Sequence, residues 1–224
     1  MARKTRQTLL LKLGIAAIVI AVFGLLFVRS LRQTAAAPYG LNQAAMTDWR
    51  LALARPDESS VAVLSLRLPQ NSARTLFEQI FQRSMQSLSA LDPPLVPLVL
   101  TSEFNIALRR VWSDSDLLAQ AEKAGLLATG FAPVCLAVRR EQHDGRPREL
   151  YFVLFDAPAF DKFRDELARL FVERGGERGT FDPLALSPMM LIAATDSDFA
   201  SWLPLRANRE GDCRAPIELS PSSP

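Results

Sequence analysis

The chain has 224 residues, of which 49% are hydrophobic and 22% are charged, a composition that excludes an intrinsically disordered protein. Its single histidine, His143, excludes a site built from several histidines, and its two distant cysteines exclude a cysteine-rich zinc module. Six of the 26 basic residues lie in residues 1–37, which contain no acid, so the remainder has 20 basic against 24 acidic residues. Because a nucleic-acid-binding domain needs a basic surface to neutralise phosphates, we expect no nucleic-acid partner.

The N-terminal region predicts a transmembrane anchor. Sixteen uncharged residues run from Leu13 to Val28, and counting from residue 9 gives 20 residues, about 30 Å of helix, which matches the hydrocarbon core of a membrane. The alternatives are a cleaved signal peptide, with Ala35 and Ala37 at its cleavage site, and a buried core helix. Four basic residues precede the apolar run and two follow it, which predicts a cytoplasmic N-terminus.

These features predict a single-pass protein of the bacterial inner membrane that contacts the lipid bilayer through its anchor. The expected organisation is a cytoplasmic tail at 1–8, the anchor at 9–28, a linker at 29–47, a periplasmic domain at 48–205 and a flexible tail at 206–224. The domain is long enough to bury a core of its own.

Within the domain, short strands alternate with amphipathic helices. In chain order we expect strands at Trp49–Ala54 and Val61–Leu68, a helix at Asn71–Ala90, strands at Phe104–Trp112, Pro133–Arg139 and Leu150–Phe155, a helix at Pro158–Arg174 and a strand at Met189–Ala194. The Asp-Gly pair in residues 142–147 predicts a tight hairpin. On the second helix, we expect Asp161, Arg164, Asp165 and Arg169 to face solvent.

The order of these elements indicates an internal duplication. Residues 49–125 and 131–203 each predict a ββαβα-like repeat, and each third strand is followed by an Asp-Ser-Asp phrase, within Ser113–Leu117 and Thr195–Phe199. Two such repeats form an antiparallel sheet covered by helices, so the expected fold class is α+β.

The two Asp-Ser-Asp phrases are typical of helix starts. We expect Ser113 and Thr195 to cap helices, with the acids favoured in the first turn, and Asn71 to cap the helix that follows it. The alternative is a metal-binding loop, but neither phrase has the glycine and the distal glutamate of an EF-hand. We therefore predict no metal site and no cofactor.

The sequence predicts no catalytic residue. His143 lies in a charged turn, and no G-x-S-x-G run is present to expose a nucleophilic serine. One alternative is a hydrolase whose serine or carboxylates converge from distant segments, with the carboxylates being Asp114, Asp116, Asp196 and Asp198. Another is a small-ligand-binding domain with a pocket at the repeat boundary, near Gly125–Pro133.

The two cysteines leave two possibilities open. Cys135 lies in an expected strand and Cys213 in the expected tail. In an oxidising compartment a disulfide between them is permitted, and it would hold the tail against the sheet. The alternative is a buried apolar Cys135 and a free thiol at Cys213.

Two short motifs carry a resemblance to a known family. Ala54-Arg55-Pro56-Asp57 and Leu100-Thr101-Ser102-Glu103-Phe104, together with the basic N-terminus and the apolar run, resemble an uncharacterised family of bacterial membrane-anchored envelope proteins with strand-strand-helix repeats. The resemblance covers roughly residues 48–170. It implies an anchored, extracytoplasmic protein and no particular activity.

Taken together, the sequence predicts a membrane-tethered, non-enzymatic interaction or scaffold module of the cell envelope, with an envelope protein as partner. The expected binding surface is a sheet edge or an uncovered sheet face. A second candidate contact is the apolar segment Pro93–Leu100, whose three prolines forbid a regular strand or helix. The favoured interpretation of this segment is a packed connection between a helix and a strand.

Overall fold

The structure, a computed structural model, describes residues 20–26, 37–55, 60–127 and 130–220. Most of the predicted anchor lies outside these residues, as does the predicted tail at 1–8. Of the region before residue 37, the structure describes only residues 20–26, which are helical. No helix in the described part of the chain is long and apolar enough to cross a membrane. This finding contradicts the predicted transmembrane helix, the single-pass topology and the inner-membrane location, and these three predictions are corrected.

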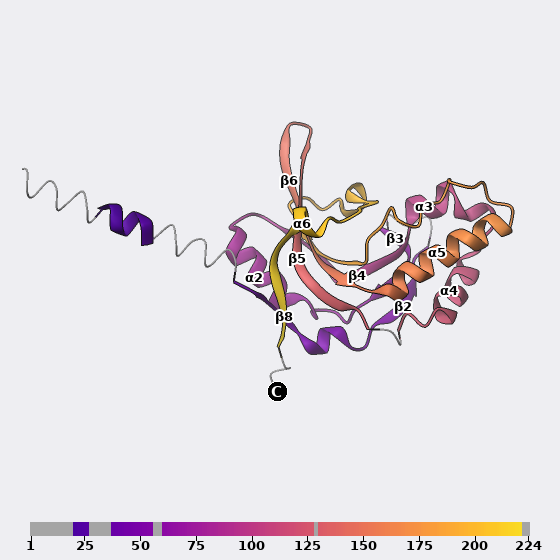
Figure 1. Ribbon diagram of the computed structural model, residues 1–224, viewed down its shortest axis with the longest axis horizontal. Coiled ribbons are helices and arrows are strands. Elements are labelled where there is room, and N and C mark those ends of the chain that lie inside the picture. Colours follow the sequence, from indigo (N-terminus) through magenta and orange to yellow (C-terminus); the bar gives the residue numbers. More distant parts are fainter. Residues whose placement is uncertain (1–19, 27–36, 56–59, 128–129, 221–224) are drawn as a thin grey trace, which may run out of the picture. The chain divides into compact units, whose positions relative to one another are not determined.

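The chain divides into two units, Met1–Ala37 and Pro38–Pro224. The second is an α+β domain on one curled sheet, which Figure 1 shows in ribbon form. Its strands are β1 (Tyr39–Asn42), β2 (Arg50–Leu53), β3 (Ala62–Arg67), β4 (Ser89–Leu100), β5 (Ala132–His143), β6 (Arg146–Asp156), β7 (Met189–Ala194) and β8 (Cys213–Ser220). The sheet order is β1-β8-β5-β6-β7-β4-β3-β2, and every neighbouring pair is antiparallel except β1 with β8.

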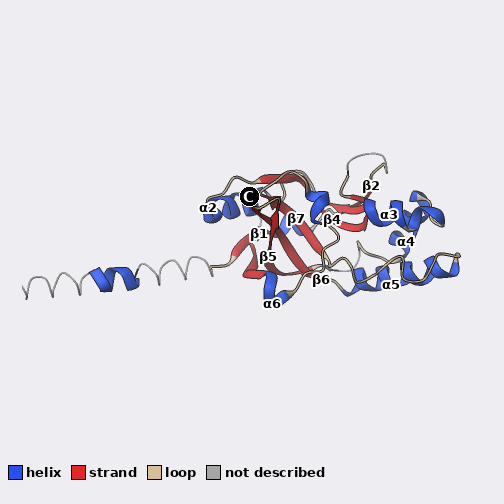
Figure 2. Cartoon of the chain, turned by 90° about the horizontal axis from the view of Figure 1, so that it is seen from above, coloured by secondary structure: helices blue, strands red, loops and turns tan. Residues whose placement is uncertain are grey.

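Helices gather at two places around this sheet. They are α2 (Arg74–Ser84), α3 (Thr101–Ile106), α4 (Asp114–Lys123), α5 (Pro158–Glu173) and α6 (Arg209–Asp212), with 3-10 turns η1 (Gln43–Met46), η2 (Leu108–Arg110) and η3 (Phe199–Trp202). Figures 1 and 2 both show α3, α4 and α5 together at one end of the domain and α2 at the other. A single apolar core joins the sheet to both groups.

Each half of the domain supplies three strands and a helix in the same order. The first half contributes β2, β3, α2 and β4, and the second contributes β5, β6, α5 and β7. In each half, successive strands lie progressively closer to the centre of the sheet, where β4 pairs with β7. The strands β8 and β1 lie beyond β5. The third strand of the first half is β4, not the predicted strand at Phe104–Trp112.

Residues 104–112 form the end of α3 and the turn η2 instead of a strand. The carboxylate of Glu103 accepts the backbone N–H of Leu100 at 2.9 Å, which stabilises a helix start. Phe104 and Leu108, four residues apart, are both buried. The apolar residues of this segment therefore follow the helical period, although they also suit a strand.

The Pro93–Leu100 segment lies in a central strand of the sheet, which corrects the prediction that its prolines prevent a strand. The register between β4 and β7 is interrupted between Ala90 and Leu95. Pro93 and Pro94 fall in this irregular stretch, where a missing N–H does not break a regular ladder. From Val96 to Leu100 the strand is buried, so the prediction of an exposed contact surface here is wrong.

The β5–β6 hairpin turns at Asp144 and Gly145, whose φ angles of 51° and 73° suit the two central positions of a type I′ turn. Its distal part projects beyond the rest of the sheet in Figure 1. The expected flexible tail at 206–224 is ordered through residue 220, because α6 and β8 lie there and β8 pairs with β5 and β1.

The core contains one arginine that the helical pattern placed on the surface. Arg164 of α5 has no exposed area, and its five N–H groups meet five acceptor contacts. Nη1 and Nη2 bond the carboxylate of Glu103 at 3.2 and 2.6 Å. The remaining bonds reach the carbonyl oxygens of Leu98 at 3.0 Å, Asp182 at 3.0 Å and Pro183 at 2.8 Å. The prediction that Arg164 faces solvent is therefore wrong.

Candidate functional site

The first Asp-Ser-Asp phrase starts a helix. Ser113 is the N-cap of α4, and its Oγ accepts the backbone N–H of Asp116 at 3.2 Å. The carboxylate of Asp116 accepts the N–H of Ser113 in return, at 3.3 Å. Hydrogen bonds from Ser113, with the nearby guanidinium of Arg174, hold the pKa of Asp116 below its usual value.

The second phrase does not repeat this arrangement. Thr195 continues the sheet, because its N–H and its Oγ1 bond the backbone of Glu149 on β6. The cap of η3 is Asp198, whose carboxylate accepts the N–H of Ser201 at 3.2 Å. Asn71 also is not a cap: α2 begins after Ala73, which makes no side-chain cap bond. Thr195 and Asn71 are thus corrected as cap predictions.

Three of the four aspartates of the hydrolase alternative have separate local partners. Asp116 lies 3.5 Å from Arg174, Asp196 lies 3.7 Å from Arg148, and Asp198 caps η3. Across the described residues, no three His, Cys, Asp or Glu side chains form a group suited to a metal ion. The duplication does not bring these carboxylates to one site.

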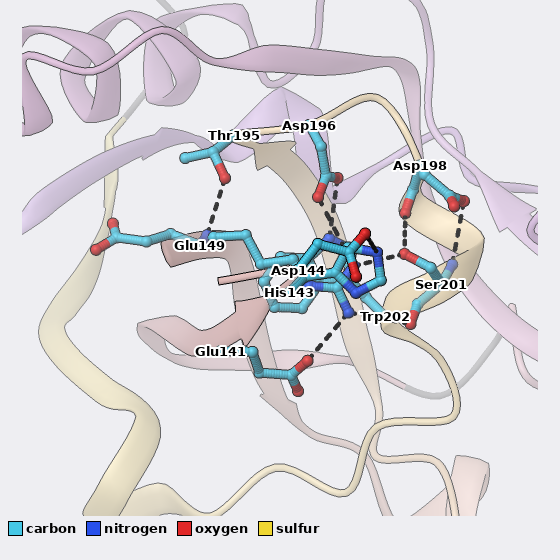
Figure 3. Close-up of polar contacts among 10 residues, drawn as sticks. Glu141, His143, Asp144, Glu149, Thr195, Asp196, Asp198, Ser201 and Trp202 are labelled. Carbon is cyan, nitrogen blue, oxygen red and sulfur yellow. Dashed lines mark hydrogen bonds and ion pairs between the residues drawn. The ribbon is translucent and has the colours of Figure 1, made fainter. Parts of the chain in front are cut away.

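Figure 3 shows the polar cluster at the base of the projecting hairpin, where β6 meets η3. Arg148 is central to it: Nη1 donates to Ser201 Oγ at 2.8 Å, Nη2 donates to Glu141 at 3.1 Å, and the guanidinium lies 4.1 Å from the centre of the Trp202 ring. Trp202 in turn donates its indole N–H to Asp196 at 3.1 Å. The cluster fixes the hairpin against η3.

This cluster lacks the geometry of a serine hydrolase. The hydroxyl of Ser201 donates to the carbonyl oxygen of Asp198 at 2.9 Å and accepts from Arg148, so no base receives its proton. His143 lies 3.7 Å from Asp144 at the exposed hairpin tip. Among the described residues, no hydrogen bond joins His143 to Ser201.

On the opposite face of the hairpin from Arg148, the carboxylate of Glu149 accepts hydrogen bonds from two side chains. It accepts from Arg140 Nε at 2.7 Å and from the Tyr151 hydroxyl. Burial of the phenol, and then its hydrogen bond to Glu149, raise the pKa of Tyr151 far above its usual value. Tyr151 is therefore a hydrogen-bond donor at physiological pH and not a proton-transfer group.

The two cysteines are joined. The disulfide links Cys135 on β5 to Cys213 at the start of β8 across 78 residues of sequence. It holds the C-terminal strand against the second half of the sheet. Disulfides form and persist in oxidising environments.

A hollow of about 220 Å³ lies at the predicted repeat boundary. It is lined on one side by Leu126, Leu127, Gly130 and Phe131, and on the other by residues 46–49. Ligand pockets usually measure about 300–1,000 Å³, so this hollow is small for a drug-sized ligand.

The two edge strands of the sheet differ in a way that matters for binding. At β1, helix α2 closes the edge: Gln79 accepts the N–H of Gly40 at 2.9 Å and donates to its C=O at 3.0 Å. Arg83 donates to the carbonyl oxygen of Pro38 at 2.9 Å and lies over the Tyr39 ring. Side chains of α2 thus take the place of a further strand.

At β2 the edge is open. Ala54 N–H bonds the Val63 carbonyl at 2.8 Å, and hydrogen-bonded positions alternate along an antiparallel pair. Arg50 and Ala52 therefore face β3, and the N–H and C=O groups of Leu51 and Leu53 point outward. In the part of the chain that the structure describes, no hydrogen bond uses these outward groups.

The open edge borders a surface hollow. The hollow measures about 600 Å³ and is lined by Asp48, Arg50, Leu51, Ala52, Arg67, Leu68 and Pro69. We call β2 together with this hollow the open edge site. The sequence predicted binding at a sheet edge without indicating which one, because the edge depends on the strand order.

Comparison with known proteins finds no match: no protein-family model, curated protein or solved structure matches the chain. The resemblance to the envelope family stays a prediction.

Proposed function

We propose that this chain is a non-enzymatic protein-interaction module that binds an extended segment of a partner as a further strand beside β2. The observation that carries the proposal is the contrast between the sheet edges: α2 closes β1, whereas four outward backbone groups of β2 have no hydrogen bond among the described residues. An unpaired strand edge is a template for another strand, and natural proteins normally protect such edges.

The charged hairpin is a weaker candidate for strand addition. Its projecting part lies within residues 139–149, where the backbone of Glu149 already bonds Thr195. This stretch carries Arg139, Arg140, Glu141, Arg146, Arg148 and Glu149. Charged side chains along an edge discourage pairing with another strand. By contrast, β2 carries a single charged residue, the exposed Arg50, followed by Leu51, Ala52 and Leu53, which are half-buried or exposed and uncharged.

The expected affinity follows from the size of the edge. Four backbone hydrogen bonds contribute about 1 kcal/mol each, and a few cross-strand side-chain pairs add about 0.5 kcal/mol each. The sum, about 5 kcal/mol, is an upper limit because association and ordering of the peptide oppose binding, so a short peptide should bind with a Kd of about 0.2 mM or weaker. A longer partner surface would bind more tightly.

The test is amide hydrogen exchange by NMR on the full chain with a capped seven-residue peptide of alternating Gln and Val. We expect the peptide to protect the amides of Leu51 and Leu53 while leaving exchange at Gly40 unchanged. The variant Leu51→Pro removes one outward N–H without removing a bond to β3, so it should weaken binding. The matched variant Leu51→Val retains that N–H and should bind normally. Unchanged exchange at Leu51 and Leu53 with several millimolar peptide would refute the proposal.

A further inference from the structure

Two arginines face each other at the open edge site. Arg50 on β2 is the register partner of Arg67 on β3, and both side chains are exposed. In the described ranges, neither guanidinium has a carboxylate within ion-pair distance, although the domain pairs many of its other arginines. Like charges directly opposite each other on neighbouring strands are destabilising.

Both arginines line the same hollow, so their positive charge is concentrated there. Arg50, Arg67 and Asp48 are its charged lining residues, so its net charge is one positive unit. The small side chain of Ala52 lies two residues along β2 from Arg50, on the same face of the strand. A longer side chain from an added strand therefore has room beside Ala52.

The other face of β2 is apolar. Leu51 is half-buried against the core, and Leu53 is 37% exposed. Because side chains alternate between faces, a strand added beside β2 places every second residue on the face of Arg50 and Ala52 and the others on the face of Leu51 and Leu53.

We infer that the partner segment is acidic, with a Glu or Asp beside Arg50 and apolar residues at the alternate positions beside Leu51 and Leu53. This inference rests on the proposed strand addition at β2. The carboxylate of the partner relieves the repulsion between Arg50 and Arg67, and the apolar residues cover the exposed leucine. A partner with basic residues at the same positions is repelled, which gives the edge its selectivity.

The test uses three capped seven-residue peptides that alternate Val with Glu, Gln or Lys, each labelled with a fluorophore. Anisotropy titrations of the full chain measure their Kd values at low salt. We expect the Glu peptide to bind about tenfold more tightly than the Lys peptide, with the Gln peptide between them. Because the arginines are exposed, the difference should shrink at 0.5 M salt.

Charge reversal provides the control. The double variant Arg50→Glu/Arg67→Glu should reverse the order, so that the Lys peptide binds more tightly than the Glu peptide. The double variant Arg178→Glu/Arg214→Glu makes the same charge change, four units, at two exposed positions outside the hollow and should keep the original order. This comparison separates local pairing from the effect of net charge.

The outcomes distinguish the inference from the proposed function. If all three peptides bind equally and protect the amides of Leu51 and Leu53, strand addition stands and the acidic preference is refuted. If Arg50→Glu/Arg67→Glu and Arg178→Glu/Arg214→Glu change the preference equally, the charge inference also fails. If no peptide binds or protects these amides, both the inference and the proposed function are overturned.

Discussion

The buried pair of Arg164 and Glu103 gives a prediction whose magnitude follows from its contacts. The arginine joins α5 to β4, to α3 and to the loop at 181–183, and its side chain is fully buried. The side chain of Glu103 is only 11% exposed. Replacing Arg164 by methionine keeps much of the volume but leaves the Glu103 carboxylate without its counter-charge and three carbonyl oxygens without the donors of the guanidinium.

We expect Arg164→Met to lower the free energy of unfolding by about 3–5 kcal/mol, because breaking a buried pair leaves one charge uncompensated. Replacing both partners, as in Arg164→Met/Glu103→Met, removes that charge and should restore at least about 2 kcal/mol of the loss. The non-additivity separates an uncompensated charge from simple loss of packing.

Urea unfolding of the full chain, followed by circular dichroism, measures these differences. The control is Arg169→Met on the same helix, whose guanidinium is 54% exposed and pairs with Glu166 and Glu173. Exposed pairs contribute little, so this control should cost about 1 kcal/mol or less. A loss below about 1 kcal/mol for Arg164→Met, or strict additivity in the double variant, would show that the buried pair is not coupled as argued.

Three further changes test other parts of the fold. Replacing Cys135 and Cys213 by alanine should lower the free energy of unfolding by up to about 4 kcal/mol, and a reductant should lower Tm only in the wild type. Ser113→Ala should cost about 1 kcal/mol in urea unfolding, and Ser113→Asp, which can still cap α4, should cost much less. Burial and the nearby Asp165 raise the pKa of Asp161, so ionisation of this carboxyl opposes folding. Asp161→Asn should therefore be more stable at pH 7 by about 0.5 kcal/mol or less, and the difference should vanish as the pH falls below about 3 and both states protonate the carboxyl.

Local signals in the sequence located much of the sheet and one long helix. The strand expected at Met189–Ala194 is β7 with the same bounds, and the helix expected at Pro158–Arg174 is α5 with one residue fewer. The Asp-Gly pair forms the turn of the β5–β6 hairpin. In these cases a single strong period, or one turn with a defined backbone geometry, determines the element.

The predictions from sequence fail where tertiary contacts override the local preference of a segment for helix, strand or surface. The apolar residues of 104–112 suit a strand, but Glu103 starts a helix by bonding Leu100 and pairing with Arg164, which is 61 residues away. Arg164 itself looked like a surface residue, because no local pattern shows that three carbonyl groups converge on it. Pro93 and Pro94 of β4 are tolerated because the register with β7 is interrupted between Ala90 and Leu95.

The open edge site also could not be located from local sequence signals, because it depends on the strand order of the whole sheet. Leu51 and Leu53 form an ordinary short strand in the sequence, and nothing in it shows that β2 lies at the end of the sheet order. Likewise, Gln79 is one of several glutamines, and its contact with Gly40 joins residues 39 positions apart. Which edge is closed and which is open is a property of the whole sheet, so it emerges only with the structure.

The closure of β1 by Gln79 leads to a last prediction. Gln79→Leu removes both bonds to Gly40, about 1 kcal/mol each, and frees the outward N–H and C=O of that residue. We expect stronger concentration-dependent self-association than in the wild type, measured by sedimentation velocity, because a second edge becomes available for pairing. Gln82→Leu makes the same change at an exposed position of α2 and should leave sedimentation unchanged, since the structure shows no bond from Gln82 to the backbone of β1. If both variants associate equally, added surface hydrophobicity is the cause, and the side chains of α2 are not what keeps this edge of the sheet from pairing.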